Sequence, residues 1–437
     1  MTGANYMLES GGEKILIDCG LRQGANAYEK ENFDPFSYDP KEISAVFITH
    51  AHVDHTGLLP KLVKHGFKGK VYSVEPTRDF AELLLIDSDH ILVQEAEKLG
   101  KPVLYDMRDI EDLMQKWEGV AYHEQINLKN FKITFRNAGH ILGSASILIE
   151  GEGKKIIFSG DLGNSPAPII GNKEFPPTDI DYCLIESAYG NRFHEDIPKR
   201  KEELRKAIME TVRAGGVLMI PAFAMERTQD LLSELNDLAE SGMIPRVPIY
   251  LDSPLAIKLT RVYSTYADYW DEKSLAKLQK GDALFSFPGL KMTLTTDESK
   301  IINEVPAPKV IIAGSGMSTA GRILHHEKRY LSDKKSALLI IGYQAVGSLG
   351  RKILEGAKMV RLLGEEVAVN CRIINVPAYS AHADQPQLLE WLKPMKGKLK
   401  KIFVVQGDEG MGEFAAKIKE TLGVEAEVPE PLSTFEL

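Results

Sequence analysis

The chain has 437 residues, of which 43% are hydrophobic and 26% charged, as is typical of a folded globular protein with two domains. No apolar run reaches the roughly 18 residues of a membrane span, and the start lacks the features of a signal peptide, so we expect a cytoplasmic protein. The net charge of −9 argues mildly against nucleic-acid binding but allows a locally basic groove, and three widely spaced cysteines favour a reducing compartment.

The predicted elements up to about residue 190 are mainly strands. Short apolar or alternating runs bounded by glycine and polar residues predict these strands, and the first two form a hairpin. Longer runs with helical spacing of leucine, isoleucine and alanine predict helices over 76–99 and 104–117. The strands are expected at 5–8, 14–18, 45–48, 70–74, 131–136, 145–150, 155–159 and 181–186.

From about residue 199 helices and strands alternate, which predicts a parallel sheet. The expected helices are 201–214, 229–242 and 254–270, and the expected strands are 217–221, 248–252, 309–313 and 338–343. Beyond 356 the pattern returns to mixed elements, with strands at 359–361, 367–377 and 402–406 and a helix at 386–392. We therefore expect an α/β protein in which residues 1–190 and 356–437 form one domain and residues 191–355 are inserted into it.

A metal site is predicted where a buried strand runs into a tight loop and the start of a helix. Three histidines and one aspartate fall within six positions there, and scattered surface histidines do not account for that density in a chain with 11 histidines. His50 and His52 can turn toward one point, whereas Asp54 and His55 can face a second point roughly 3.5–4 Å away, as in two-metal sites. Nitrogen and carboxylate ligands without thiolate suit zinc and, less strictly, manganese or iron.

Other predicted strands end in a carboxylate or an amide, and open α/β sheets build sites at that edge. His140, in a loop between two strands, can reach the same edge and join the imidazoles, although a lone buried histidine is more often a core residue. Asp161 can bridge two metals through its two oxygens. The residues expected at this edge are Asp18, His50, Asp161, Glu186 and Gln406.

Two dications held there would turn a water between them into a hydroxide nucleophile near neutral pH. Asp54 would orient that water as well as bind a metal. Asp18 lies too early in its loop to be an obvious ligand. We expect it to accept a hydrogen bond from a ligand histidine, with a turn-capping role as the alternative.

The pattern His50-x-His52-x-Asp54-His55 resembles the metal-binding signature of the metallo-β-lactamase superfamily. Further motifs follow in a fixed order at 186–190, 221–229, 251–254, 314–317, 342–350 and 379–384. Together they resemble the β-CASP branch, which includes the nuclease subunit of the eukaryotic pre-mRNA cleavage complex and its bacterial and archaeal relatives. The resemblance spans nearly the whole chain. It implies an αββα metallo-β-lactamase sandwich, an inserted α/β β-CASP domain, and zinc-dependent cleavage of RNA.

The resemblance also implies a pair that assists the leaving group, in which Glu186 holds a proton on His382. The alternative for this histidine is a structural turn residue. The loop of Ser315 and Gly316 could offer donors to a phosphate, with a plain tight turn as the alternative. Three arginines in the inserted motifs are expected as phosphate contacts, with solvated surface arginines as the alternative: Arg227, Arg322 and Arg351.

Two departures from the family pattern affect these expectations. The chain starts almost inside the first hairpin, whereas the family usually has a strand before Gly3, so we expect either a lost edge strand or an upstream start. Gln406 stands where RNA-cleaving members place a histidine on the second metal. We therefore expect one tightly bound zinc ion. The second metal should be weakly bound, exchangeable with manganese, or absent.

Our interpretation is a zinc-dependent endoribonuclease. One alternative is a 5′-3′ exoribonuclease of the same family, although those enzymes carry an extra C-terminal domain. Another is a thioesterase-like metallo-hydrolase, which would not need an inserted domain of this size. A third is an RNA-binding subunit that has lost its activity. The expected partner is RNA, and the oligomeric state stays open between a monomer and a homodimer.

Overall fold

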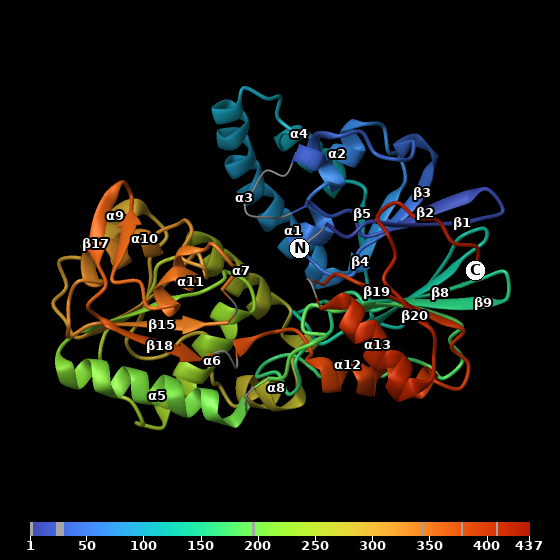
Figure 1. Ribbon diagram of the computed structural model, residues 1–437. Coiled ribbons are helices and arrows are strands. Elements are labelled where there is room, and N and C mark those ends of the chain that lie inside the picture. The colour runs from blue at the N-terminus through green and yellow to red at the C-terminus, as the bar shows by residue number, and fades with distance from the viewer. Residues whose placement is uncertain (1–2, 23–29, 195–196, 343, 377–378, 408–409) are drawn as a thin grey trace. The chain divides into compact units, whose positions relative to one another are not determined.

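The computed structural model describes residues 3–22, 30–194, 197–342, 344–376, 379–407 and 410–437. The chain forms two compact units (Figure 1). Unit 1 comprises Met1–Phe193 and His382–Leu437, and unit 2 comprises His194–Ala381. The chain therefore leaves unit 1 once and returns to it once, so that unit 2 is an insertion.

Unit 1 contains two twisted sheets. The first has five strands in the order β1-β2-β3-β4-β5, parallel except for the β1–β2 hairpin. The second has seven strands in the order β20-β19-β10-β9-β8-β7-β6, with parallel pairs from β20 to β9 and antiparallel pairs from β9 to β6. The strands are β1 (Tyr6–Ser10), β2 (Glu13–Ile17), β3 (Ile43–Phe47), β4 (Lys70–Val74), β5 (Trp117–Val120), β6 (Gln125–Asn127), β7 (Lys132–Asn137), β8 (Ala145–Gly151), β9 (Lys154–Phe158), β10 (Tyr182–Glu186), β19 (Lys401–Val405) and β20 (Ala426–Glu427).

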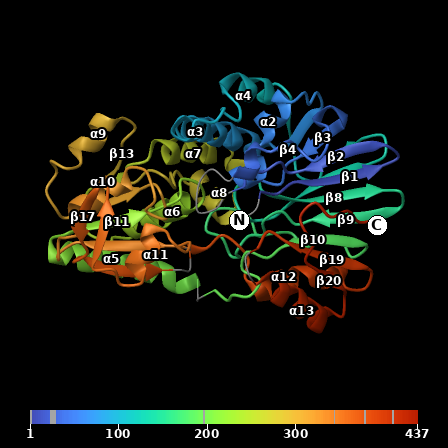
Figure 2. The same ribbon diagram turned by 45° about the horizontal axis from the view of Figure 1, so that its top comes forward.

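The two sheets of unit 1 pack face to face between layers of helices. Aromatic rings meet across the sheets, with Phe47 6.3 Å from Phe135 and Tyr6 5.8 Å from Phe158 between centroids. Figure 2 shows α2, α3 and α4 along the first sheet and α12 and α13 along the second, which gives the expected αββα sandwich. The helices are α1 (Val53–Thr56), α2 (Leu59–Lys64), α3 (Glu75–Leu99), α4 (Met107–Met114), α12 (Gln385–Leu392) and α13 (Met411–Leu422).

Unit 2 is built on a six-stranded parallel sheet in the order β13-β12-β14-β11-β15-β18. Its central strands are continuous apolar runs, as expected of a sheet covered on both faces. Its strands are β11 (Val217–Pro221), β12 (Ile249–Leu251), β13 (Leu290–Met292), β14 (Lys309–Ala313), β15 (Ala337–Ile341) and β18 (Arg372–Val376), with a separate hairpin of β16 (Met359–Leu362) and β17 (Glu365–Ala368). Its helices are α5 (Ile197–Ala214), α6 (Arg227–Glu240), α7 (Pro254–Thr265), α8 (Glu272–Gln279), α9 (Thr296–Ile301), α10 (Ile323–Tyr330) and α11 (Leu349–Leu354).

The insertion is longer than the sequence predicts. Residues 356–381, expected in the first domain, belong to unit 2 because β18 pairs in parallel with β15 along its whole length. The expected strand over 367–377 is two strands, β17 and β18, and its last residue lies outside the described residues. The short helices α8 to α11 and the helix α13 were not predicted.

Two further expectations concern burial and membranes. Among the described residues, no helix combines the length and apolarity that crossing a bilayer requires. The three cysteines, Cys19, Cys183 and Cys371, are free and buried, as their apolar neighbours in the sequence predict.

Candidate metal centre

The polar residues expected at the strand ends of unit 1 lie at one edge of its two sheets. Glu186 is the last residue of β10, which pairs in parallel with both β9 and β19. Asp161 follows β9 and Gln406 follows β19 directly, so their side chains start from the same edge. Asp18 and Gln406 leave their strands with positive φ angles of 59° and 51°, an uncommon conformation that turns the chain sharply after the strand.

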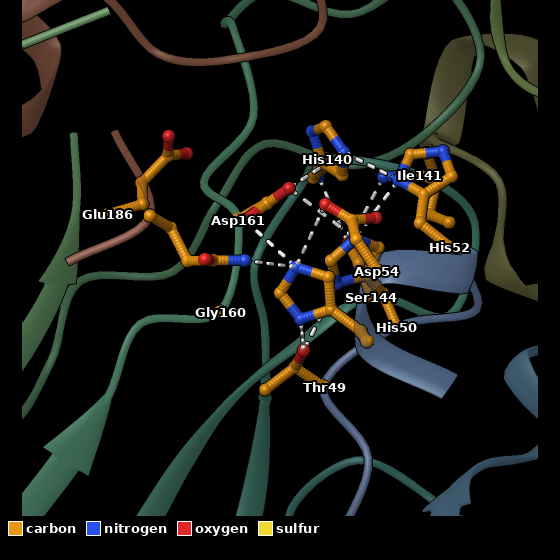
Figure 3. A network of polar contacts seen from close by, with 12 residues as sticks. Thr49, His50, His52, Asp54, His140, Ile141, Ser144, Gly160, Asp161 and Glu186 are labelled. Atoms are coloured by element: carbon orange, nitrogen blue, oxygen red, sulfur yellow. Dashed lines mark hydrogen bonds and ion pairs between the residues drawn. The ribbon is translucent and has the colours of Figure 1, made fainter. Parts of the chain in front are cut away.

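Four side chains converge on a first cation position. The Nε2 of His50 lies 3.0 Å from Nδ1 of His52, which lies 3.4 Å from Nε2 of His140. Oδ2 of Asp161 lies 3.4 Å from Nε2 of His50 and 3.7 Å from Nε2 of His140. A tetrahedral zinc with bonds of about 2.0 Å separates its ligand atoms by roughly 3.3 Å. Three nitrogens and one oxygen at these separations therefore fit zinc (Figure 3).

A second group of donors shares Asp161 with the first. Its other oxygen, Oδ1, lies 3.5 Å from Nε2 of His55, which in turn lies 3.9 Å from Oδ2 of Asp54. The amide of Gln406 is 3.1 Å from the same His55 nitrogen. One oxygen of Asp161 thus faces each group, which is the arrangement of a carboxylate that bridges two cations. The second group holds one imidazole nitrogen where the first holds three.

Asp18 and Thr49 contact the Nδ1 atoms of His55 and His50. Oδ2 of Asp18 accepts a hydrogen bond of 2.7 Å from Nδ1 of His55, and its two oxygens also accept from the main chain and the hydroxyl of Thr49. The Thr49 hydroxyl lies 3.0 Å from Nδ1 of His50. All four side chains are buried. Such contacts fix the orientation of the ring and leave Nε2 for the cation.

Burial and charge set the protonation of the donors. Burial and the neighbouring imidazoles hold the pKa of His50 well below its usual value, so this ring stays neutral and offers a lone pair. Burial also opposes charge on His55, but three surrounding carboxylates outweigh it and raise the pKa of His55 to about 10. Burial raises the pKa of Asp161 to about 7 against the opposing effect of nearby histidines. A bound dication would favour the deprotonated form of each donor.

His382 and Glu186 lie beside the first group. Nδ1 of His382 is 3.3 Å from Oε2 of Glu186 and 3.9 Å from Oδ2 of Asp161. Glu186 is fully buried, and its other oxygen accepts a hydrogen bond of 2.5 Å from the main-chain N–H of Leu162. The ring of Tyr189 stacks on His382 with a centroid distance of 6.0 Å and an interplanar angle of 19°. A buried carboxylate beside a half-buried imidazole is suited to holding a proton on it.

Sequence reasoning missed Thr49, Tyr189 and Tyr6. Thr49 directly precedes His50, so its place next to the motif was visible, but its bonds to Asp18 were not. Tyr6 lines a small cavity beside Asp18 and Gln406, and burial and nearby carboxylates raise the pKa of its hydroxyl. Tyr189 lies in the motif at 186–190, but its stacking on His382 was not visible there, and no spacing signal in the sequence connects Tyr6 with the site.

The residues expected to contact phosphate all lie in unit 2, and most already have partners there. The hydroxyl of Ser315 accepts hydrogen bonds from two amides of its own loop, and the carbonyl of Gly316 accepts one from Gln344. Arg322 donates to the buried carboxylate of Asp252 at 2.7 Å. Arg227 lies 3.7 Å from Asp230, and Arg351 bonds Glu355 on the surface of α11. Arg322 and Arg227 thus have carboxylate partners within unit 2 that the sequence analysis did not identify.

Replacing Asp18 by alanine should weaken metal binding without removing a ligand. His55 loses the acceptor that orients its ring, and loss of such a contact typically lowers metal affinity by about 10- to 100-fold. Calorimetric titration of the metal-free protein with the metal ion measures the change in affinity. Asp18→Asn should lose less, because its amide oxygen can still accept from Nδ1 of His55. Equal affinity in the wild type and Asp18→Ala would show that Asp18 only shapes its turn.

The sequence matches three family descriptions in chain order. Residues 2–208 match the "Metallo-beta-lactamase superfamily" and residues 228–353 the "Beta-Casp domain". Residues 366–429 match the "Zn-dependent metallo-hydrolase RNA specificity domain". A crystal structure titled as a protein of unknown function from Enterococcus faecalis has a TM-score of 0.59 and 12% identity, and the match covers 98% of this chain and 95% of that one. That likeness concerns the fold alone.

Several curated proteins are similar along most of their length. Ribonuclease TTHA0252 of Thermus thermophilus is 37% identical, and the match covers 94% of this chain and 91% of that protein. The RNase J-like protein of Methanocaldococcus jannaschii is 33% identical, with 95% and 92% covered. Transcription termination factor FttA of Methanosarcina mazei is 32% identical, with 99% and 69% covered. The chain therefore belongs to the metallo-β-lactamase superfamily, in its β-CASP branch, and is a metal-dependent hydrolase by family.

Proposed function

We propose that this protein is a zinc-dependent endoribonuclease that hydrolyses phosphodiester bonds. The observation that carries the proposal is the cluster of His50, His52, His140 and Asp161. Asp54 and His55 lie on the other side of Asp161, and Glu186 and His382 lie next to it. The names of the relatives, a ribonuclease and an RNase J-like protein, support RNA as the substrate. The match to an RNA specificity domain over residues 366–429 supports the same substrate.

The protein's own residues would hold two cations. His50, His52 and His140 would bind the first together with one oxygen of Asp161, and the second group would bind the other. When bound, divalent cations there supply positive charge for a phosphate and lower the pKa of water. Three imidazole nitrogens favour zinc at the first position.

The remaining steps belong to acidic and basic side chains. Asp54 would orient the attacking water and accept a hydrogen bond from it. His382 would give its proton to the leaving oxygen as that bond breaks. Glu186, 3.3 Å from His382, would keep the ring protonated until then and stabilise the charge on it. The products are two RNA fragments, one ending in a phosphate and the other in a hydroxyl.

A cleavage assay on two substrate classes tests this proposal. Purified protein is incubated with labelled RNA and, separately, with a thioester, each before and after chelation and after addition of zinc. We expect RNA cleavage that chelation abolishes and zinc restores, with no thioester hydrolysis. Metal-dependent hydrolysis of the thioester without cleavage of RNA would replace the proposal with the thioesterase alternative. Release of mononucleotides from one end alone would replace it with the exonuclease alternative.

Gln406 should make the second metal the weaker one. A glutamine amide is a weaker zinc donor than a neutral imidazole, and its oxygen suits manganese or magnesium better. After dialysis we expect about one tightly held zinc ion per chain, and Gln406→His should raise this toward about two. Elemental analysis, with activity followed during manganese add-back, measures both. Two tightly held zinc ions in the wild type would contradict the expectation, and so would Gln406→His with unchanged metal content.

A further inference from the structure

The position of His382 depends on the turn that follows Asp161. The main chain of His382 pairs with that of Gly163, and the N–H of Ala383 donates to the carbonyl of Leu162 at 2.7 Å. The N–H of the same Leu162 donates to the carboxylate of Glu186. One turn therefore bonds both members of the Glu186–His382 pair, and its position sets the distance between them.

This turn is packed directly against the loop that carries His140. The N–H of Gly163 donates to the carbonyl of Ala138 at 2.9 Å. A Cβ on Gly163 would lie 1.6 Å from the main-chain oxygen of Gly139, so only glycine permits this approach. Main-chain contacts that do not involve the Lys173 side chain therefore hold the turn against the loop that carries His140, while the other side of the turn bonds His382.

Lys173 joins the turn to the helix that follows His382. Its ammonium donates to the carbonyl of Gly163 at 2.8 Å, to Oε1 of Gln387 in α12 at 2.7 Å and to the hydroxyl of Ser165 at 3.2 Å. These three hydrogen bonds use all three N–H donors of the lysine ammonium. The amide of Gln387 also accepts from the N–H of Ser165 at 3.0 Å and donates to Asn164 at 2.8 Å. Lys173 and Gln387 thus brace residues 163–165 from one side.

The main chain around Lys173 is itself tied to the site. The N–H of Glu174 donates to the carbonyl of Asn137 at 2.8 Å, and its own carbonyl accepts from the indole of Trp391 in α12 at 2.8 Å. A Cβ on Gly139 would lie 2.5 Å from the nitrogen of Lys173. Lys173 is half-buried, and burial lowers its pKa to about 8, which still leaves the amine charged at neutral pH.

We propose that Lys173 is a positioning residue for proton delivery, which holds His382 at the distance from Glu186 and the leaving group that transfer requires. The proposal rests on the proposed function, in which His382 protonates the leaving oxygen. Lys173 touches neither substrate nor cation in this role. It acts through the carbonyl of Gly163 and through Gln387, so its loss should slow the step that needs the proton and leave metal binding intact.

The test compares an oxygen RNA with two sulfur RNAs, each of which differs from it in one atom. Sulfur replaces the 3′ bridging oxygen of the scissile bond in one and the 5′ bridging oxygen in the other. The RNA in which sulfur is the leaving atom is called the sulfur substrate. A thiol has a pKa of about 8.5, so sulfur leaves without a proton. Metal-loaded wild-type protein should cleave the oxygen and sulfur substrates at similar rates. His382→Ala should be slow on the oxygen substrate alone.

Lys173→Met should follow the same pattern as His382→Ala. On the oxygen substrate we expect kcat to fall by about 10- to 100-fold with little change in KM, because a small misplacement costs transition-state stabilisation. On the sulfur substrate the rate should return close to that of the wild type. Lys173→Arg should regain part of the loss. Gln387→Leu should give a milder form of the pattern, and it serves as the test if Lys173→Met does not fold.

Lys61→Met is the matched control, because Lys61 is a buried lysine whose ammonium also donates to two main-chain carbonyls, those of Asn32 and Asp34. It should lower the melting temperature while keeping the wild-type ratio of the two rates. The inference would be overturned if Lys173→Met and Gln387→Leu each lost as much rate on the sulfur substrate as on the oxygen substrate. It would also be overturned if these variants bound less metal than the wild type. If the wild type cleaved neither substrate, the proposed function itself would fail.

Discussion

Asp54→Ala should abolish RNA cleavage while leaving the fold intact. The substitution removes a donor of the second cation position and the group that orients the attacking water, and loss of a central catalytic group costs on the order of 10³-fold or more in kcat. Asp54 is buried in the first turn of α1, and its main-chain carbonyl, which accepts a hydrogen bond from the N–H of Ala4, is unchanged by the substitution. Cleavage of labelled RNA by the purified variant measures the loss, and circular dichroism checks the fold.

Asp34→Ala is a suitable control for this variant. Asp34 is an exposed aspartate of unit 1, and its main-chain carbonyl, which accepts a hydrogen bond from Lys61, is unchanged by the substitution. Asp34→Ala should cleave RNA as the wild type does. If purified Asp54→Ala retained near-normal cleavage with its metal content unchanged, hydrolysis by a water oriented at the metal centre would be wrong.

His382→Ala should lower turnover more than it lowers RNA affinity. The proton is needed only as the bond breaks, so the loss appears in kcat, by about 10²- to 10⁴-fold, as for other general acids. Glu186→Gln should give the same pattern more mildly and shift the pH dependence of kcat toward acid, because His382 loses the carboxylate that favours its protonated form. Single-turnover cleavage and equilibrium RNA binding separate the two effects.

The sulfur substrate makes this prediction specific. His382→Ala and Glu186→Gln should both recover on it, because a sulfur leaving group needs no proton. Weaker RNA binding with unchanged turnover would instead assign His382 to substrate binding. Slow cleavage of both substrates by His382→Ala would instead give His382 a structural role, in which it maintains the turn at Gly163.

Much of the metal centre could be predicted because its residues are local in the sequence. His50, His52, Asp54 and His55 lie within one strand–loop–helix segment, so their convergence needs no knowledge of the rest of the fold. Asp161 and Gln406 could be added because parallel strands present their carboxyl ends at one edge. The sequence could not predict the bonds of Lys173, because they join segments that are 10 and 214 residues apart.

Other features that the sequence does not reveal have the same origin. The sequence predicts Arg322 as a phosphate contact or a solvated surface arginine, and its partner Asp252, 70 residues away, becomes visible only in the folded sheet. The strand β18 follows a hairpin that looks like the start of a mixed sheet, yet it pairs with β15 of unit 2. The choice among sheets is made by long-range packing, which the local pattern does not encode.

Cleavage of a closed circular RNA tests the central claim most directly, because a circle offers no end to an exonuclease. Wild-type protein and Asp54→Ala are stripped with chelator, reloaded with zinc, and incubated with the labelled circle. We predict that the zinc-loaded wild type converts the circle to a linear molecule and then to shorter fragments. The stripped protein and Asp54→Ala should leave the circle intact. A circle that stays intact with the zinc-loaded wild type, while linear RNA of the same sequence is degraded, would contradict the account.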